Sequence, residues 1–298
     1  MYTSCKLCAR ECAVNREAGE RGYCKMGAKP VIARAALHHW EEPPISGTRG
    51  SGAIFFSGCS LGCVYCQNRE ISGGAVGAEV SDERLAEIML ELEKKGAHNI
   101  NFVTPTHFVP SLISAVREAR ERSLKIPIVY NTGSYDSLAA VEALRGTVDI
   151  FLPDLKYMRE RSALEYSCAK GYTDNALRVI RAMREIAGEP VFDDDGIMLR
   201  GVIVRVLLLP GHVAEAKLAV GALYREFSDS VYISIMNQYT PMPGMKAPLD
   251  RRVTRSEYRE LVGYAEKIGV RCAFVQELGA ADESYIPEFD NTGVLPTK

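Results

Sequence analysis

Three cysteines lie within eight positions of the chain, in the stretch CSLGCVYC over residues 59–66. Cys59, Cys63 and Cys66 follow the spacing C-x3-C-x2-C and come just after a short apolar run. Thiolates are soft ligands that suit zinc and iron–sulfur centres, and both kinds of closed site take four protein ligands. Three thiols therefore leave one metal position open, which is a mark of a catalytic metal site. The other reading is a zinc knuckle completed by a distant His or Cys.

A second group of cysteines lies near the start of the chain. Cys5, Cys8, Cys12 and Cys24 are spaced C-x2-C-x3-C-x11-C. Four thiols around a C-x2-C nucleus indicate a closed metal site, and zinc and an auxiliary [4Fe–4S] cluster both fit. The surrounding residues have little apolar periodicity, so metal binding would help to order them. Free surface thiols are the alternative.

The elements that must position these groups follow from hydrophobic periodicity. Apolar runs predict strands at 53–58, 99–105, 126–132, 148–156, 198–211, 231–239 and 270–278. Amphipathic patterns predict helices at 81–96, 110–122, up to residue 144, at 174–187 and 212–227, and from the capping box TRSE at 254–257. Strands that are apolar throughout and alternate with helices favour an α/β fold with a parallel sheet.

We therefore expect a partial (β/α)6 barrel of the TIM type, with an open doubly wound sheet as the second possibility. Residues 1–50 are expected to form a small irregular Cys-rich, metal-binding lobe, and residues 51–298 the barrel with a C-terminal extension. Trp40 could pack the lobe against the barrel, whereas Glu41 and Glu42 are expected to be solvated more often than catalytic.

Polar residues gather where the expected strands end, which is where parallel α/β folds place their active sites. They are Thr104, Thr106, His107, Asn131, Thr132, Asp154, Lys156, Arg205, His212, Asn237, Gln238 and Tyr239. Asp154 and Lys156 lie on the same side of one strand and suit a zwitterionic ligand, although a surface ion pair is the alternative. Arg205 lies within an apolar run and needs an anionic partner, either a ligand carboxylate or a neighbouring acid.

The cysteine loop, with Tyr65 before its third cysteine, resembles the C-x3-C-x-Φ-C motif of the radical SAM superfamily, in which Φ is aromatic. The resemblance implies a [4Fe–4S] cluster on Cys59, Cys63 and Cys66, with S-adenosylmethionine chelating the open iron. In that family, reductive cleavage of S-adenosylmethionine yields a 5′-deoxyadenosyl radical, which abstracts a hydrogen atom.

Within the superfamily, residues 53 to about 240 look most like the activating enzymes of pyruvate formate-lyase and other glycyl radical enzymes. This resemblance implies catalytic roles for Lys156 and Arg205. It also implies contacts to S-adenosylmethionine from Tyr65, Thr104, Thr106, Asn131, Thr132, Asp154, Lys156 and Arg205.

There are two departures from the pattern of that group. VTPTHF replaces its Gly-Gly-Glu, so Thr104, Thr106 or backbone carbonyls must hold the ligand's amino group. Asn131 replaces an aspartate and removes a negative charge near the ligand, where the group can hold a monovalent cation.

The leading functional hypothesis is hydrogen abstraction from a glycyl residue of a partner enzyme. The alternatives are modification of a peptide or small metabolite, and a non-catalytic iron–sulfur or zinc electron-transfer protein. We expect an electron donor such as flavodoxin or ferredoxin. The net charge of −2 and the pI of about 6.3 favour neither nucleic acid nor membrane partners. The start MYTSCKLCAR shows no targeting segment, so a cytoplasmic location is expected.

Overall fold

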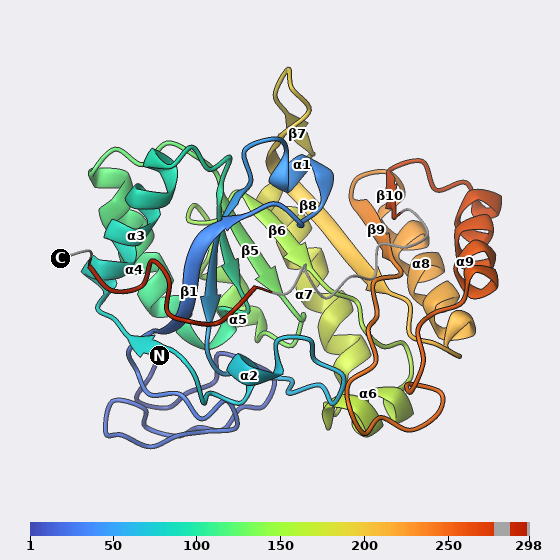
Figure 1. Cartoon of the computed structure of the whole chain (residues 1–298), viewed down its shortest axis with the longest axis horizontal. Helices are drawn as coiled ribbons and strands as arrows, with labels where there is room; N and C mark the ends of the chain where they lie inside the picture. The colour runs from blue at the N-terminus through green and yellow to red at the C-terminus, as the bar shows by residue number, and fades with distance from the viewer. Residues whose placement is uncertain (277–286, 297–298) are drawn as a thin grey trace.

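A mostly parallel β-sheet forms the centre of the computed structural model, which describes residues 1–276 and 287–296 (Figure 1). In this part of the chain, seven neighbouring strands run parallel in the order β10-β9-β8-β6-β5-β4-β2. These strands are β2 (Ser51–Phe56), β4 (Ile100–Val103), β5 (Ile128–Thr132), β6 (Ile150–Pro153), β8 (Met198–Leu207), β9 (Tyr232–Met236) and β10 (Ala273–Val275). Within the described residues β2 and β10 do not pair, so the barrel is open. The expected partial barrel is confirmed.

Helices return the chain between successive strands and cover the outside of the sheet. They are α3 (Asp82–Lys94), α4 (Val109–Glu121), α5 (Leu138–Glu142), α6 (Glu160–Ser167), α7 (Tyr172–Ala187), α8 (Val213–Phe227) and α9 (Arg255–Ile268). Ser81, Ser137 and Thr254 cap α3, α5 and α9 by accepting backbone N–H groups, and Thr254 with Glu257 completes the expected capping box. The sequence patterns did not predict α6. None of the helices in the described part of the chain is long and apolar enough to cross a bilayer.

An antiparallel strand extends the sheet beyond β2. It is β1 (Val31–His38), which pairs with β2 from Ile32 opposite Phe56 to His38 opposite Ser51. The expectation of irregular structure throughout residues 1–50 is therefore wrong for this segment. Arg34 interrupts its apolar run, which hides the strand in the sequence. The short β3 (Ala78–Glu79) continues the sheet from the start of β1.

The segment between β1 and β2 fills the amino end of the barrel. There α1 (Pro43–Ser46) places Ile45 among buried apolar side chains of β5, β6 and β8. Asn99 fixes this segment because its Nδ2 donates to the Ile45 carbonyl at 2.7 Å. The connection leading into α1 therefore runs inside the barrel. A hairpin of β7 (Val191–Phe192) with β8 projects from the same end (Figure 1).

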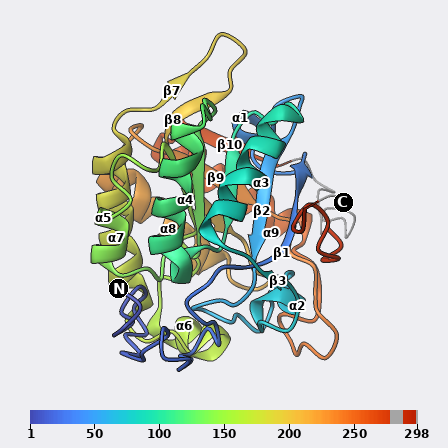
Figure 2. The ribbon, with the colours of Figure 1, turned by 90° about the vertical axis from the view of Figure 1, so that its left-hand side faces the viewer.

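The first thirty residues lie at the opposite end of the sheet, beside α6 and the short α2 (Arg69–Ser72) (Figure 2). The lobe, as we call residues 1–30, contains no helix or strand in the structure. Backbone hydrogen bonds tie it to the loop after β5, from Ala9 N to the Tyr135 carbonyl at 2.9 Å and from Ser137 N to the Leu7 carbonyl at 3.0 Å. The lobe therefore lies against the carboxyl ends of the parallel strands.

Candidate active site

An open cavity, whose empty space is about 1320 Å³ when open solvent is included, lies at the carboxyl ends of the parallel strands. Among the residues that line it are Glu41, Cys59, Cys63, Tyr65, Cys66, Thr104, Asn131, Asp154, Lys156, Arg205, Gln238 and Tyr239. The structure thus gathers the three-cysteine loop and most of the expected strand-end residues around one space.

The three-cysteine loop follows β2 and is held in place by the lobe. Gly58 has a φ of +83°, and a Cβ there would lie 2.7 Å from the Cys24 carbonyl, so this position requires glycine. The Leu61 N–H approaches Cys59 Sγ at 3.3 Å and donates to it. Backbone donors of this kind stabilise thiolate ligands, so the loop is shaped for sulfur ligation.

The chemistry of these three thiols fits an iron–sulfur cluster. Burial, with the other cysteines beside it, raises the pKa of Cys66 to about 12, and burial also raises the pKa of Cys59. Such thiols stay protonated unless a metal supplies positive charge. In the described residues, no three Cys, His, Asp or Glu side chains are already gathered into a metal-binding arrangement. The three thiols therefore line one cavity but are not already arranged as the ligands of a metal.

A chain of hydroxyl groups leads from Tyr65 to one of these sulfurs. Tyr65 donates to the Tyr157 hydroxyl at 2.8 Å, which lies 2.6 Å from Ser167 Oγ. Ser167 Oγ in turn donates to Cys63 Sγ at 3.0 Å. The expected cofactor residue Tyr65 thus lines the cavity, while its hydroxyl acts through Tyr157 and Ser167. Ser167 ends α6, so no sequence pattern had pointed to it.

Two cations converge on the Asp154 carboxylate. Lys156 Nζ lies 2.7 Å from Oδ2, and Arg205 Nε lies 2.7 Å from Oδ1. Burial alone would raise the pKa of Asp154, but Arg205 and Lys156 together hold it below its usual value. Burial likewise opposes the charge on Lys156, yet Asp154 keeps its pKa above the ordinary value. All three groups are therefore charged at neutral pH.

The partners of Arg205 include two acids that the sequence analysis expected to be solvated. The side chain of Glu41 is only 9% exposed and its Oε2 lies 3.4 Å from Arg205 Nη1. Asn101 Nδ2 donates to the other Glu41 oxygen at 3.0 Å, and Arg205 Nη2 donates to Asn131 Oδ1 at 2.5 Å. Glu42 is 7% exposed. The expectation of solvation was wrong because the segment leading into α1 runs inside the barrel.

Glu42 is poorly compensated in its position. Burial, with the Glu41 carboxylate beside it, raises its pKa to about 7, although Arg205 opposes the shift. Its Oε2 has no hydrogen-bond partner among the described residues. In this structure the anionic partners of Arg205 are therefore neighbouring acids. This is one of the two alternatives that the sequence left open, the other being a ligand carboxylate.

The remaining expected residues divide into two groups. Thr104, at a left-handed φ of +54°, lines the cavity with Asn131. Thr106 and Thr132 lie outside the cavity lining, because their hydroxyls meet at 3.2 Å and Thr132 donates to Asp136 Oδ2 at 2.6 Å. Contact between these two threonine side chains and S-adenosylmethionine stays a prediction.

Three further strand-end residues, His107, His212 and Asn237, are also absent from the cavity lining. The His107 ring is buried against the Ser57 carbonyl, 2.7 Å from its Nε2. His212 instead lies 3.0 Å from the hydroxyl of Tyr166, in a neighbouring depression.

The four N-terminal cysteines lie together in the lobe. Burial raises the pKa of Cys8 to about 12, and the nearby thiols of Cys24 and Cys12 add to the shift. Cys5 and Cys12 likewise contribute to the raised pKa of Cys24, whose main cause is burial. All four cysteines thus lie in the lobe, next to the three-cysteine loop, but no three of them are already gathered into a metal-binding arrangement.

Comparison with known proteins identifies the family. The sequence model of the radical SAM superfamily matches residues 53–212, which is more than half of the chain. This chain belongs to the radical SAM superfamily. An uncharacterized protein of Methanocaldococcus jannaschii is 28% identical to it over 277 residues, covering 90% of this chain and 75% of the relative.

Solved structures show the same fold. HydG, a maturase of the [FeFe]-hydrogenase, aligns with a TM-score of 0.53 and 14% identity, over 78% of this chain and 53% of that one. SuiB of Streptococcus suis, solved with S-adenosylmethionine, aligns with a TM-score of 0.52 and 12% identity, over 74% of this chain and 49% of that one. This chain spans about half the length of both proteins.

Family membership makes this protein a radical SAM enzyme whose cofactors are a [4Fe–4S] cluster and S-adenosylmethionine. The cavity brings together the three thiols and the ion pair of Asp154 and Lys156.

Proposed function

We propose that this radical SAM enzyme abstracts a hydrogen atom from a polypeptide segment, and that the hydrogen donor is a glycyl residue of a partner enzyme. The observation that carries the polypeptide part is the shape of the cavity mouth. Next to the cavity lies a second depression of about 540 Å³ along β1, and the two share His38, Trp40, Phe55 and Pro287 in their linings.

This pair of depressions supports an extended substrate. Trp40 is 56% exposed beside them, and exposed aromatic side chains are common anchors in protein recognition. Arg34 and His39 line the outer depression and add polar groups to it. A polypeptide could lie along β1 and place one residue in the cavity. Trp40 would then contact the substrate rather than pack the lobe against the barrel.

Within the cavity, Cys59, Cys63 and Cys66 would hold the cluster. When bound, the cluster and S-adenosylmethionine would supply a 5′-deoxyadenosyl radical, with release of methionine, after an external donor such as flavodoxin or ferredoxin delivered one electron. Asp154 and Lys156 present fixed opposite charges to the amino acid part of that ligand. Arg205 holds the Asp154 carboxylate in place and, with Glu41, keeps the inner wall of the cavity charged and ordered.

Deuterium transfer tests the proposal. Proteins from cells grown on α-deuterated glycine are dialysed and incubated anaerobically with the reconstituted enzyme, a reductant and S-adenosylmethionine. Deuterium should appear in 5′-deoxyadenosine, and the protein fraction should show a glycyl radical doublet in its EPR spectrum. Transfer only from the small-molecule fraction would reject a polypeptide substrate, whereas transfer from proteins labelled at other residues would reject the glycyl assignment.

A further inference from the structure

The lobe holds its shape with few regular backbone interactions. The loop from Cys5 to Val14 is closed by two hydrogen bonds of 2.9 Å, from Cys5 N to the Val14 carbonyl and from Ala13 N to the Cys5 carbonyl. A turn inside this loop, from Glu11 N to the Cys8 carbonyl at 3.0 Å, brings the second and third cysteines toward each other. Further bonds, among them Arg16 N to the Tyr2 carbonyl at 2.8 Å, join turns of the lobe rather than strands or a helix.

The backbone of the lobe is strained beside its cysteines. Glu11 and Ala13, on either side of Cys12, have φ angles of 45° and 54°, and Lys25, just after Cys24, has a φ of 61°. Non-glycine residues in this region cost about 1–3 kcal/mol each and persist only where the surroundings fix them. Each of the three donates its backbone N–H to a carbonyl of the lobe, that of Cys8, Cys5 and Gly22 respectively, and a metal on the adjacent thiols would add to these bonds.

The third and fourth cysteines meet around one turn. A Cβ at Gly22 would lie 2.8 Å from Cys12 Sγ, so the sulfur rests directly on that glycine. Tyr23 N lies 3.4 Å from the same sulfur and donates to it. Cys24 follows Tyr23 directly in the chain, so the same turn carries the fourth cysteine.

A residue that lies between two cysteines of the lobe also donates hydrogen bonds to the three-cysteine loop. Arg10, between Cys8 and Cys12, donates to the Ser60 carbonyl at 2.8 Å and to the Leu61 carbonyl at 3.4 Å. It also donates to the carbonyl of Ser167, the residue whose hydroxyl contacts Cys63, at 2.8 Å.

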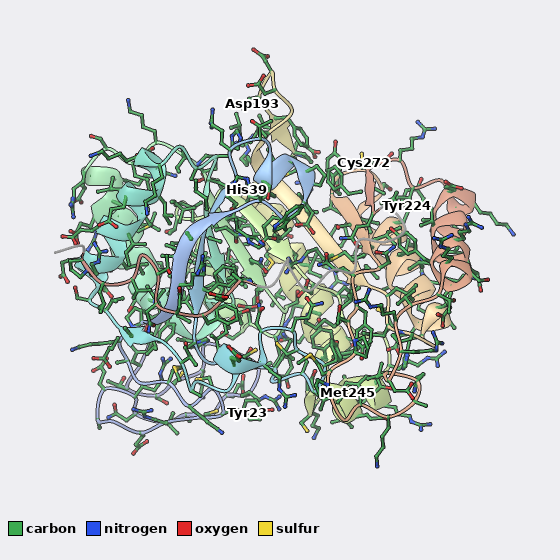
Figure 3. The ribbon with its side chains drawn as sticks, viewed as in Figure 1. Tyr23, His39, Asp193, Tyr224, Met245 and Cys272 are labelled. Carbon is green, nitrogen blue, oxygen red and sulfur yellow. The ribbon has the colours of Figure 1, made fainter. Side chains whose placement is uncertain are left out.

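Tyr23 is a second residue of the lobe that contacts the three-cysteine loop. Its hydroxyl donates to the Leu61 carbonyl at 3.2 Å, and its ring lies 3.8 Å below the Arg10 guanidinium. Figure 3 shows Tyr23 at the lower edge of the molecule, on the side of α2 and α6. Any group that fixes the lobe's cysteines therefore also fixes the two side chains that hold the loop.

We propose that Cys5, Cys8, Cys12 and Cys24 bind a second metal centre, and that this centre keeps Arg10 and Tyr23 on the loop that carries Cys59 and Cys63. Four thiols lose their protons on binding, with no change of oxidation state in the protein. Zinc and an iron–sulfur cluster share this thiolate chemistry. The metal draws together four sulfurs that already lie in one lobe, and it acts on the catalytic cluster only through positioning.

Metal analysis of a chain without the catalytic thiols tests the site directly. The variant Cys59→Ala/Cys63→Ala/Cys66→Ala is purified anaerobically, offered zinc or iron with sulfide, and measured for bound metal. We expect it to keep either one zinc or about four irons per chain, which distinguishes the two kinds of centre. Further substitution of Cys8→Ala and Cys24→Ala should remove that metal, whereas Cys272→Ala, a thiol outside both groups, should not. A triple variant that binds neither metal overturns the proposal.

The positioning role is tested in the chain with all its cysteines. Arg10→Ala should leave the metal of the lobe in place but alter the EPR spectrum of the reduced catalytic cluster and its response to S-adenosylmethionine. Arg10→Lys should restore part of the response. The control is Arg21→Ala, which removes an exposed arginine of the same lobe that, among the described residues, donates to the Lys25 carbonyl at 3.2 Å and not to the three-cysteine loop. If Arg10→Ala gives the same spectra as Arg21→Ala, the lobe does not position the loop. These readouts do not depend on the substrate, so they stand apart from the glycyl proposal.

Discussion

Asp154 and Arg205 join two neighbouring strands of the barrel through both backbone and side chain. Asp154 follows β6 and forms a parallel bridge to Arg205 on β8, while Arg205 Nε lies 2.7 Å from its carboxylate. The bridge fixes the backbone positions of both residues, and the ion pair fixes their side chains. Because Lys156 shares the carboxylate, the cavity presents an ordered set of charges before any ligand binds.

Removing the charge of Asp154 should destabilise the protein and disable the site. In Asp154→Asn, two buried cations lose their common counter-ion, so the free energy of unfolding should fall by about 3–5 kcal/mol. Cleavage of S-adenosylmethionine, measured as 5′-deoxyadenosine by chromatography, should fall about 100-fold because Lys156 is no longer held in place. Glu260→Gln, which breaks an exposed pair with Lys217, should cost less than about 1 kcal/mol. Equal losses of unfolding free energy in the two variants would show that the buried ion pairs of Asp154 contribute no more to stability than an exposed pair does.

The hydroxyl chain should tune the reduction potential of the cluster. Hydrogen bonds to a cluster's sulfur ligands favour its reduced, more negative form, so Ser167→Ala should lower the potential. EPR-monitored redox titration measures the shift. Tyr65→Phe breaks only the far end of the chain, the bond to Tyr157, and should shift the potential less. A larger shift in Tyr65→Phe than in Ser167→Ala would contradict this role of Ser167.

Glu42 should make the folded protein less stable as the pH rises. Its pKa of about 7 in the folded chain exceeds that of an exposed glutamate, so the folded state binds more protons between roughly pH 4.5 and 7. The stability that this carboxyl contributes is therefore complete below that window and lost as the pH rises through it. At pH 8 the free energy of unfolding of Glu42→Gln should exceed that of the natural protein by about 1–3 kcal/mol, whereas at pH 4.5 the two should differ little. Urea unfolding at both pH values measures this, and a gain of equal size at both would refute the assignment.

The capping box of α9 gives a prediction that concerns stability alone. Thr254 Oγ1 accepts the Glu257 N–H at 3.2 Å, and Glu257 Oε2 accepts the Thr254 N–H at 2.8 Å. Thr254→Ala should lower the free energy of unfolding by about 1 kcal/mol, whereas Ser256→Ala, inside the same helix, should change it little. Thermal unfolding of both variants tests this, and an unchanged midpoint in Thr254→Ala would count against the cap.

Local patterns sufficed to predict the barrel and one wall of its cavity. The parallel strands are apolar throughout, and the groups at their ends, such as Asp154 and Lys156, follow directly from strand positions. The helix caps at Ser81 and Thr254 were readable for the same reason, since each depends on residues close in sequence. Features that depend on residues close in sequence could thus be predicted from the sequence.

Features that depend on long-range contacts were not predictable in this way. Glu41 and Glu42 precede a Pro-rich stretch and look solvated, and only the insertion of Ile45 into the barrel places them beside Arg205. Ser167 became relevant because α6 brings it to Cys63, 104 residues earlier in the chain. The last two positions of the strand expected at 270–278 lie outside the described residues. Within the described part, β10 covers Ala273–Val275.

The central claim is that Cys59, Cys63 and Cys66 carry a cluster that cleaves S-adenosylmethionine. The most direct test compares the natural chain with Cys63→Ala after anaerobic reconstitution, using Cys168→Ala, an exposed thiol outside both groups, as the control. With reductant and S-adenosylmethionine, the natural chain and Cys168→Ala should form 5′-deoxyadenosine, and Cys63→Ala should form none. Equal yields of 5′-deoxyadenosine from Cys63→Ala, or none from the iron-loaded natural chain, would contradict the account.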